Sequence, residues 1–376
     1  MLGFHNNFLL RRICGASLAV ICCSLNVEAL EWSAKTQPIL SASEQYLVTP
    51  HLTTLAAMPI AVQEIYPVLH QGEIYVAGGI SSHLPIPDGQ MTVAVQIYNI
   101  AQNQWRRGPD LPEGRHHAQL VSLGNELYLL GGFVRAERAQ TDNFWQDGNW
   151  QASADILKLS SQAKAWQRVG KLPQPLAETV SFVKDQQIHL LGGRSPAGAD
   201  NSQWQHHIDQ DWHWQINPRA LPAPEAVTEL AKLPVKKNSA AIAVLNQQAW
   251  WLGGRNRELG NAQGLAAFDF VGARWLPAAQ TPDLPEAQAG LAAAAIGTQI
   301  CVFGGEGSQE PNNVFHTIWC FTPKTGHWQA EGQMQPARHG HGAVAVGDAV
   351  YLIGGATAAG LKETTGLLQR WQRGSK

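Results

Sequence analysis

Six pairs of adjacent glycines, each closing a short apolar run, constrain the fold of this 376-residue chain more than any other feature. The runs read YVAGGI, YLLGGF, HLLGGR, WWLGGR, CVFGGE and YLIGGA, and their doublets begin at Gly78, Gly131, Gly192, Gly253, Gly304 and Gly354. Successive doublets are separated by 53, 61, 61, 51 and 50 residues. A period near 50 residues is typical of stacked four-stranded units. The sequence therefore predicts an all-β protein built from six such units.

Each unit carries further marks in a fixed order. In the second unit an alternating strand leads to a polar turn at Gly124 and Asn125, and the next strand ends in the doublet. This turn chemistry and the strand composition indicate a β-hairpin. A tryptophan falls at an equivalent place in four units, at Trp105, Trp166, Trp275 and Trp328. Because indole rings are large and apolar, we expect these four side chains to pack between neighbouring units.

This pattern resembles the kelch repeat, in which an aromatic residue precedes a glycine doublet and a tryptophan follows well after it. The resemblance covers roughly Leu52 to Trp371 and implies a six-bladed β-propeller. The sixth unit ends at Lys376, soon after its third strand, so we expect the segment 48–55 to supply its missing outer strand and close the propeller. Such closure hides strand edges that would otherwise pair with another chain. The prediction is a single propeller domain over residues 30–376.

The first 29 residues have the pattern of a secretory signal peptide. Arg11 and Arg12 precede an apolar stretch over residues 13–25, and Ala29 is the small residue expected at a cleavage site. We therefore expect a periplasmic or secreted protein that is free of the membrane after cleavage. The net charge of −2 offers no basic excess to neutralise phosphates, which disfavours nucleic acid as a partner.

Removal of that segment would leave two cysteines, Cys301 and Cys320. They lie on the second and third strands of the fifth unit, which should be antiparallel neighbours. Two readings stay open at this point, a cross-strand disulfide in an oxidising compartment and a pair of buried free thiols. We predict the disulfide.

Alignment of the repeats on the doublet also aligns the start of each innermost strand, where a propeller lines its central channel. Three positions recur there. The first holds Val62, Arg115, Leu176, Lys237, Gln288 and Arg338, the second Gln63, His116, Ala177, Asn238, Ala289 and His339, and the third Glu64, His117, Glu178, Ser239, Gly290 and Gly340. Residues just after the doublets should lie beside them, among them His83, Arg135, Arg194, Arg255, Arg257 and Glu306. We expect a ligand at this channel mouth.

The residue types at the mouth suggest acid–base chemistry on an anionic ligand. Carboxylates and imidazoles can accept and donate protons near neutral pH, and we assign these roles to Glu306, His116 and Glu178. Guanidinium groups bind carboxylates bidentately. We expect ligand-binding residues at Arg115, Arg338, His339, Arg194, Arg255, Lys237 and Trp145, the last in an aromatic loop suited to sugar rings. The competing interpretation is that the arginines and histidines at these entries bond to neighbouring carbonyls.

Among exported kelch proteins of this size, the chain resembles the N-acetylneuraminate epimerase class, which are periplasmic mutarotases. The resemblance implies an acidic sugar as ligand and no cofactor. We find no His, Cys, Asp or Glu set at a diagnostic metal spacing, and we predict no metal site. The alternative is a non-catalytic propeller that binds a glycan or a protein through its loop-rich face.

Overall fold

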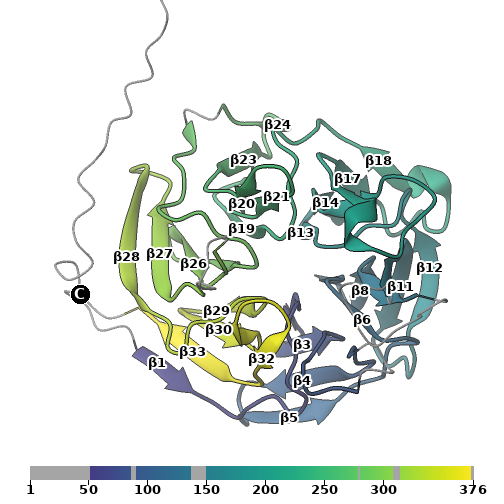
Figure 1. Ribbon diagram of the computed structural model, residues 1–376, viewed down its shortest axis with the longest axis horizontal. Helices are drawn as coiled ribbons and strands as arrows, with labels where there is room; N and C mark the ends of the chain where they lie inside the picture. The colour runs from purple at the N-terminus through teal and green to yellow at the C-terminus, as the bar shows by residue number, and fades with distance from the viewer. Residues whose placement is uncertain (1–50, 86–89, 137–149, 278–279, 308–313, 374–376) are drawn as a thin grey trace, which may run out of the picture. The chain divides into compact units, whose positions relative to one another are not determined.

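A computed structural model describes residues 51–85, 90–136, 150–277, 280–307 and 314–373, all within the compact unit formed by residues 42–376. The proposed signal peptide lies outside these residues. In the part described, no helix is long and apolar enough to span a membrane. Six four-stranded antiparallel sheets stand around a central axis, and each sheet is one blade (Figure 1).

The first three blades follow the chain order from inner to outer strand. Their strands are β2 (Val68–His70), β3 (Glu73–Ala77), β4 (Val95–Asn99) and β5 (Gln104–Arg107), then β7 (Gln119–Leu123), β8 (Glu126–Leu130), β11 (Asp155–Ser160) and β12 (Gln167–Lys171), then β13 (Val180–Lys184), β14 (Gln187–Leu191), β17 (His213–Ile216) and β18 (Val227–Glu229).

The fourth and fifth blades repeat this order, and the sixth takes its outer strand from the other end of the chain. Their strands are β19 (Ala241–Leu245), β20 (Gln248–Leu252), β23 (Leu265–Asp269) and β24 (Arg274–Trp275), then β25 (Ala292–Ile296), β26 (Gln299–Phe303), β27 (Thr317–Thr322) and β28 (His327–Gln333), then β29 (Gly342–Val346), β30 (Ala349–Ile353), β33 (Leu368–Gln372) and β1 (His51–Thr54). Strand β1 pairs antiparallel with β33, with Leu52 opposite Trp371.

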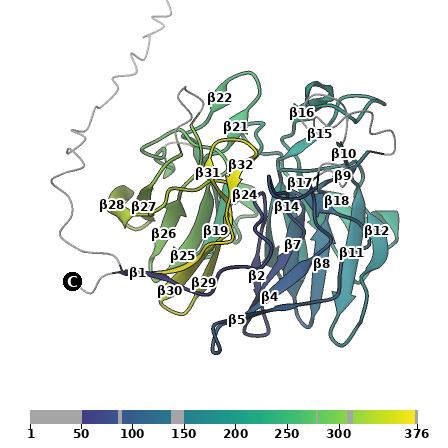
Figure 2. The ribbon, with the colours of Figure 1, turned by 60° about the horizontal axis from the view of Figure 1, so that its bottom comes forward.

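Short hairpins rise from the loops after the doublets, on one side of the blades (Figure 2). Two 3-10 turns, η3 (Trp204–His206) and η4 (Pro224–Ala226), lie within the third unit. The hairpin strands are β6 (Arg115–His116), β9 (Phe133–Arg135) and β10 (Trp150–Ala152), then β15 (Arg194–Pro196) with β16 (His207–Asp209), β21 (Arg255–Asn256) with β22 (Gly260–Asn261), and β31 (Ala356–Ala358) with β32 (Lys362–Thr364).

The doublets join each blade to the next. A Cβ on Gly304 would lie only 2.0 Å from the carbonyl oxygen of Arg338 in the following blade, and its φ of +55° disfavours any side chain. The neighbouring Gly305 N–H donates to that same carbonyl at 2.9 Å. The equivalent bond recurs at every seam, from Gly79 to Arg115, Gly132 to Leu176, Gly193 to Lys237, Gly254 to Gln288 and Gly355 to Val62. Close backbone approach therefore explains why both positions are glycine.

The four repeated tryptophans pack between blades, as predicted. Trp328 lies against the fourth-blade strands, in a cluster that includes Leu252 and Phe321. Its indole N–H donates to the carbonyl of Pro282 in the preceding linker at 3.2 Å. The indole N–H of each of the other three also donates to a backbone carbonyl, from Trp105 to Ala56, from Trp166 to Pro109 and from Trp275 to Ala231. The disulfide prediction is also confirmed, since Cys301 and Cys320 are register partners and form a buried bridge.

Candidate functional site at the channel mouth

The third of the aligned positions forms a ring around the axis, which we call the inner ring. Its six members have φ between +47° and +60°, and they are Glu64, His117, Glu178, Ser239, Gly290 and Gly340. Backbone hydrogen bonds of 2.7–3.1 Å link neighbours, from His117 to Glu64, Ser239 to Glu178, Gly290 to Ser239, Gly340 to Gly290 and Glu64 to Gly340. This left-handed conformation turns the chain sharply at the entry to the innermost strand of each blade, and it draws the six blades together at the axis.

The residues after the doublets lie beside the inner ring, as the alignment predicts. Arg255 forms a β-bridge with Asn238, and Glu306 forms one with Ala289, the residue before Gly290 of the inner ring. Equivalent bridges occur at the first, third and sixth blades. In the second blade the short strands β6 and β9 pair in the same way. The hairpins and the entries to the innermost strands therefore share one face of the propeller, which we call the mouth.

Six charged or titratable side chains meet at the mouth, and we call them the mouth cluster. They are Glu64, His117, Glu178, Arg255, Glu306 and His339. Glu64 accepts a hydrogen bond from His117 Nε2 at 2.8 Å. Burial alone would lower the pKa of His117, but the Glu64 carboxylate outweighs it and raises that pKa. Burial would raise the pKa of Glu64, yet His117 and His339 together hold it well below its usual range. The opposite directions of the two shifts favour a pair of imidazolium and carboxylate.

Arg255 is the central cation of the mouth cluster. Its Nη1 donates to Glu306 Oε1 at 2.9 Å, its Nε donates to Asn238 Oδ1 at 3.2 Å, and its Nη2 donates to Ser239 Oγ at 3.3 Å. Burial lowers the pKa of Arg255, but Glu178 and the other two glutamates raise it by more than burial lowers it, so the net shift is upward. The charge of Arg255 in turn helps to lower the pKa of Glu64 and of Glu178.

His339 lies between two partly exposed carboxylates. Its Nδ1 is 3.7 Å from Glu64 Oε1 and 3.7 Å from Glu306 Oε2, and both glutamate side chains are 13% exposed. Its Nε2 lies 2.9 Å from the carbonyl oxygen of Ala358, which fixes the ring orientation. The mouth thus presents two accessible carboxylates on either side of one imidazole nitrogen, a geometry that can pass protons.

The structure places three of the predicted anion-binding cations elsewhere. Arg338 is fully buried in its own blade, where it donates to the carbonyls of Gly354 and Leu367 and to Gln369. Arg115 donates to the carbonyl of Gly131 and to Glu113. Burial lowers the pKa of Arg338 to about 9. These side chains support the doublet turns and are not brought together with Glu306, as the competing interpretation had it.

Lys237 follows the same pattern in the fourth blade. Its Nζ donates to the carbonyl of Gly264 at 3.1 Å and lies 4.0 Å from the ring centroid of Trp251. Burial lowers its pKa to about 7. The three first-position cations thus all point into a blade, where they donate to backbone carbonyls. The sequence alignment fixes the position of these residues but not that direction.

Two of the assigned proton carriers and Arg194 lie in the buried layer behind the accessible carboxylates. Glu178 is 1% exposed and accepts a hydrogen bond from Ser239 Oγ at 2.7 Å. Arg194 Nη1 lies 4.0 Å from Glu178, and its Nη2 donates to the carbonyl of His207. His116 contacts His117 through their Nδ1 atoms at 2.6 Å, and burial lowers its pKa. Trp145 lies outside the described residues.

Sequence reasoning placed Glu64 and His117 in the aligned ring but did not choose either of them as a catalytic residue. The signal was available, because a glutamate and a histidine replace the glycines found at the third position of the last two blades. A polar residue held at positive φ on a channel is an unusual placement, and such backbone strain clusters at functional sites. Asp209 was also missed. It accepts hydrogen bonds from Asn238 Nδ2 and from the Arg257 N–H, both at 2.6 Å, and so fixes the bridge that carries Arg255.

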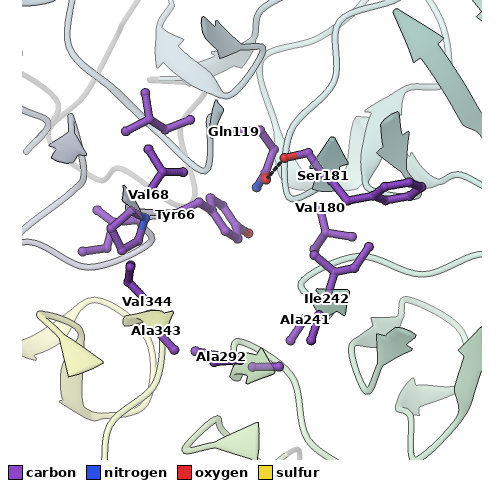
Figure 3. A pocket seen from close by; sticks show the side chains of 18 of the residues that line it. Tyr66, Val68, Gln119, Val180, Ser181, Ala241, Ile242, Ala292, Ala343 and Val344 are labelled. Atoms are coloured by element: carbon purple, nitrogen blue, oxygen red, sulfur yellow. Dashed lines mark hydrogen bonds between the residues drawn. The ribbon is translucent and has the colours of Figure 1, made fainter. Parts of the chain in front are cut away.

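Beyond the inner ring the chemistry changes. A cavity of about 390 Å³ runs along the innermost strands, and its lining begins one or two residues after the inner ring in each blade. Figure 3 shows the Tyr66 ring pointing into it, with Val180, Ile242 and Ala343 on other sides. We call this cavity the central channel. Among the described residues, no group of three His, Cys, Asp or Glu side chains could hold a metal ion.

Comparison with known proteins agrees with this architecture. Residues 225–355 match a family model described as the KLHDC2/KLHL20/DRC7 Kelch-repeats domain, and residues 67–112 match the Kelch motif. The solved structure titled "Structure of YjhT" superposes with a TM-score of 0.68 at 16% identity, covering 84% of this chain and 96% of that one. The repeats and the six sheets define the chain as a kelch-repeat β-propeller.

Curated relatives share the repeats at low identity. Kelch-like protein terF of Aspergillus terreus is 25% identical over 82% of this chain and 64% of its own length. Beta-scruin of Limulus polyphemus is 22% identical over 79% of this chain and 30% of its own length. Kelch-like protein 38 of Mus musculus is 21% identical over 80% of this chain and 45% of its own length. The chain thus spans between about a third and two thirds of these relatives.

Proposed function

We propose that this protein binds a sugar at the mouth and catalyses the interconversion of its anomers. Mutarotation needs a group that takes the proton from the anomeric hydroxyl and a group that protonates the ring oxygen, after which the ring opens and recloses. The observation that carries the proposal is the pair of partly exposed carboxylates, Glu64 and Glu306, both 3.7 Å from His339 Nδ1.

In this mechanism Glu306 accepts the proton of the anomeric hydroxyl, with Arg255 stabilising its charged form. His117, protonated by virtue of its pairing with Glu64, supplies the proton for the ring oxygen through the Glu64 carboxyl group. Since the reverse transfers restore both groups, the enzyme ends each turnover in its starting state. His116 and Glu178 then support these carriers from the buried layer.

The substrate class rests on the resemblance to the N-acetylneuraminate epimerase class, which favours an acidic sugar. Arg255 supports it, because its side chain is 28% exposed at the mouth and can approach a carboxylate from solvent. With Arg115, Arg338 and Lys237 directed into the blades, Arg255 is the main candidate for that contact. Three carboxylates nearby suit the sugar hydroxyls.

Exchange NMR between the two anomers tests the proposal. We expect the protein to accelerate exchange of N-acetylneuraminate, and Glu306→Gln to lower that rate at least about 100-fold, the usual contribution of a general base. Glu126→Gln is the matched control, since Glu126 bonds Tyr128 and Lys158 on the second blade away from the mouth. Binding without faster exchange would make the protein a glycan-binding propeller. No response to acidic or neutral sugars would direct the search to protein partners of the loop-rich face.

We also propose that the protein is exported, to the periplasm or outside the cell, with residues 1–29 as its signal peptide. The buried Cys301–Cys320 bridge supports this, because such disulfides persist mainly in oxidising compartments. Expression of the full chain, cell fractionation and N-terminal sequencing test it. A product retained in the cytoplasm with residues 1–29 intact would overturn it.

A further inference from the structure

The central channel has the size and lining of a ligand site in its own right. Its volume of about 390 Å³ falls within the range of about 300–1,000 Å³ found for small-molecule sites. Small side chains keep this space open, because alanines make up three of the four lining residues in each of the fourth and fifth blades and two of the five in the sixth. They are Ala240, Ala241, Ala243, Ala292, Ala293, Ala294, Ala343 and Ala345.

Five polar side chains line this otherwise apolar space, Tyr66, Gln119, Ser122, Ser181 and His341, and neither ring nitrogen of His341 has a hydrogen-bond partner among the described residues. The Tyr66 ring projects into the channel (Figure 3), and no hydrogen bond to its hydroxyl is found among the described residues. Burial together with the charges of Glu64 and Glu178 raises the pKa of Tyr66 well above its usual value. The phenol therefore keeps its proton and offers a hydrogen-bond donor to whatever occupies the channel. Gln119 and Ser181, in contrast, bond to one another across two blades.

The apolar lining of the channel disfavours anions. The charges behind Tyr66 largely compensate one another, because Glu64 and Glu178 lie close to His117 and Arg255. None of the lining residues is a lysine or an arginine, so a carboxylate or sulfonate in the channel would lose its hydration without gaining a counter-ion. A neutral ligand meets no such penalty.

The far end of the channel is apolar as well. Leu69 on β2 is 37% exposed and lines the cavity, and Val244 on β19, next to the lining residue Ala243, is 42% exposed. The lining spans four or five residues in each blade, a depth of about 13–16 Å at the usual rise per residue. An elongated molecule of two fused rings fits that depth.

We propose that the central channel is a second ligand site, which takes a small neutral molecule with an apolar body and one hydrogen-bond acceptor directed at Tyr66. It opens away from the mouth and does not depend on the sugar chemistry proposed above. The acceptor meets the phenol at the inner end, while the apolar body lies along the alanine-rich strands.

The neutral naphthalene ketone prodan is a suitable probe, because its carbonyl is an acceptor and its emission shifts to the blue in apolar surroundings. We expect saturable binding of one prodan per protein with a blue shift. Anilinonaphthalene sulfonate, which carries a charge on a similar ring system, should bind at least tenfold more weakly. Equal affinity for the two probes would overturn the proposal.

Two substitutions test whether prodan binds in the central channel. Ala343→Trp and Ile242→Trp each fill it from a different blade, and each should weaken prodan binding at least tenfold. Ala101→Trp, at an exposed turn after β4, is the matched control and should leave the affinity unchanged. Circular dichroism and thermal unfolding establish that each variant is folded. Undiminished binding by either folded variant would overturn the assignment to the channel, as would the absence of saturable binding to the unsubstituted protein.

Discussion

The mouth and the central channel lie at successive levels of the same six blades, yet their chemistry is opposite. At the mouth, Arg255 lies among three glutamates and two histidines. One or two residues further along the chain in each blade the channel lining begins, and half of its residues are alanine or valine. The inner ring separates them, because its left-handed residues turn the chain and change the direction in which the next side chain points. A single aligned column of a repeat can thus divide two functional regions.

Among the substitutions described here, removal of Arg255 should give the largest difference between the effect on the mouth and the effect on the central channel. Arg255→Ala leaves three carboxylates without their central cation, so we expect a loss of about 3 kcal/mol in the free energy of unfolding and a loss of anomer exchange of 100-fold or more. Prodan binding should persist in the folded protein. Chemical denaturation and exchange NMR measure these effects. Arg107→Ala, which removes an exposed ion pair with Asp110, should change stability by less than about 1 kcal/mol.

The inner ring offers a pair of glycines that separates backbone strain from displacement of a catalytic group. A Cβ on Gly340 would lie 2.6 Å from Glu64 Oε1, whereas a Cβ on Gly290 would meet nothing closer than 3.6 Å. Both have φ near +60°, so each alanine variant should cost about 1–2 kcal/mol of stability. Only Gly340→Ala should also slow anomer exchange, by about tenfold. Equal activity of the two variants would contradict the role given to Glu64.

The protonation of the mouth cluster can be followed by titration of His117. We expect its pKa, measured by NMR titration, to lie above 6.5 while that of the adjacent His116 lies below 6.5. Glu64→Gln should lower the pKa of His117 by about one unit or more, whereas Glu126→Gln should not change it. A His117 pKa at or below 6.5 in the unsubstituted protein would remove the proposed proton donor.

The same pair fixes the sign of the pH dependence of stability. The raised pKa of His117 contributes stability that is present below pH 6.5 and is lost as the pH rises through the folded value. The lowered pKa of Glu64 contributes stability that is present above pH 4.5 and is lost as the pH falls. The pair therefore stabilises the fold most between about pH 4.5 and 6.5, and Glu64→Gln should remove that contribution.

Tyr66→Phe is the mildest test of the comparison. It removes one hydroxyl from the channel and leaves the mouth cluster in place, so prodan affinity should fall about threefold to tenfold, the contribution of one hydrogen bond. Anomer exchange should stay within about twofold of the unsubstituted rate. A fluorescence titration and exchange NMR on the same preparation measure both. A larger effect on exchange than on prodan would show that the two regions are coupled.

Much of the fold could be predicted from the sequence, because the period, the turns and the doublets are local signals that recur six times. The positions around the mouth followed from the alignment for the same reason. The directions of the side chains did not. Arg338 and Arg255 both belong to the predicted site, but one points into its blade and the other into the mouth. That choice depends on left-handed turns and on carbonyls from neighbouring strands, which no single residue type encodes.

The partnership between β1 and β33 has a consequence for how the chain folds. Leu52 and Trp371 are opposite one another, although almost the whole domain separates them in the sequence. Contacts of such long range are slow to form, since the loop between them must first be closed. The sixth blade can be completed only after the last repeat has left the ribosome, and until then β1 has no strand to pair with. We expect this unpaired strand to govern aggregation during synthesis, so that changes in β1 reduce the yield of folded protein more than changes in the outer strand of any other blade.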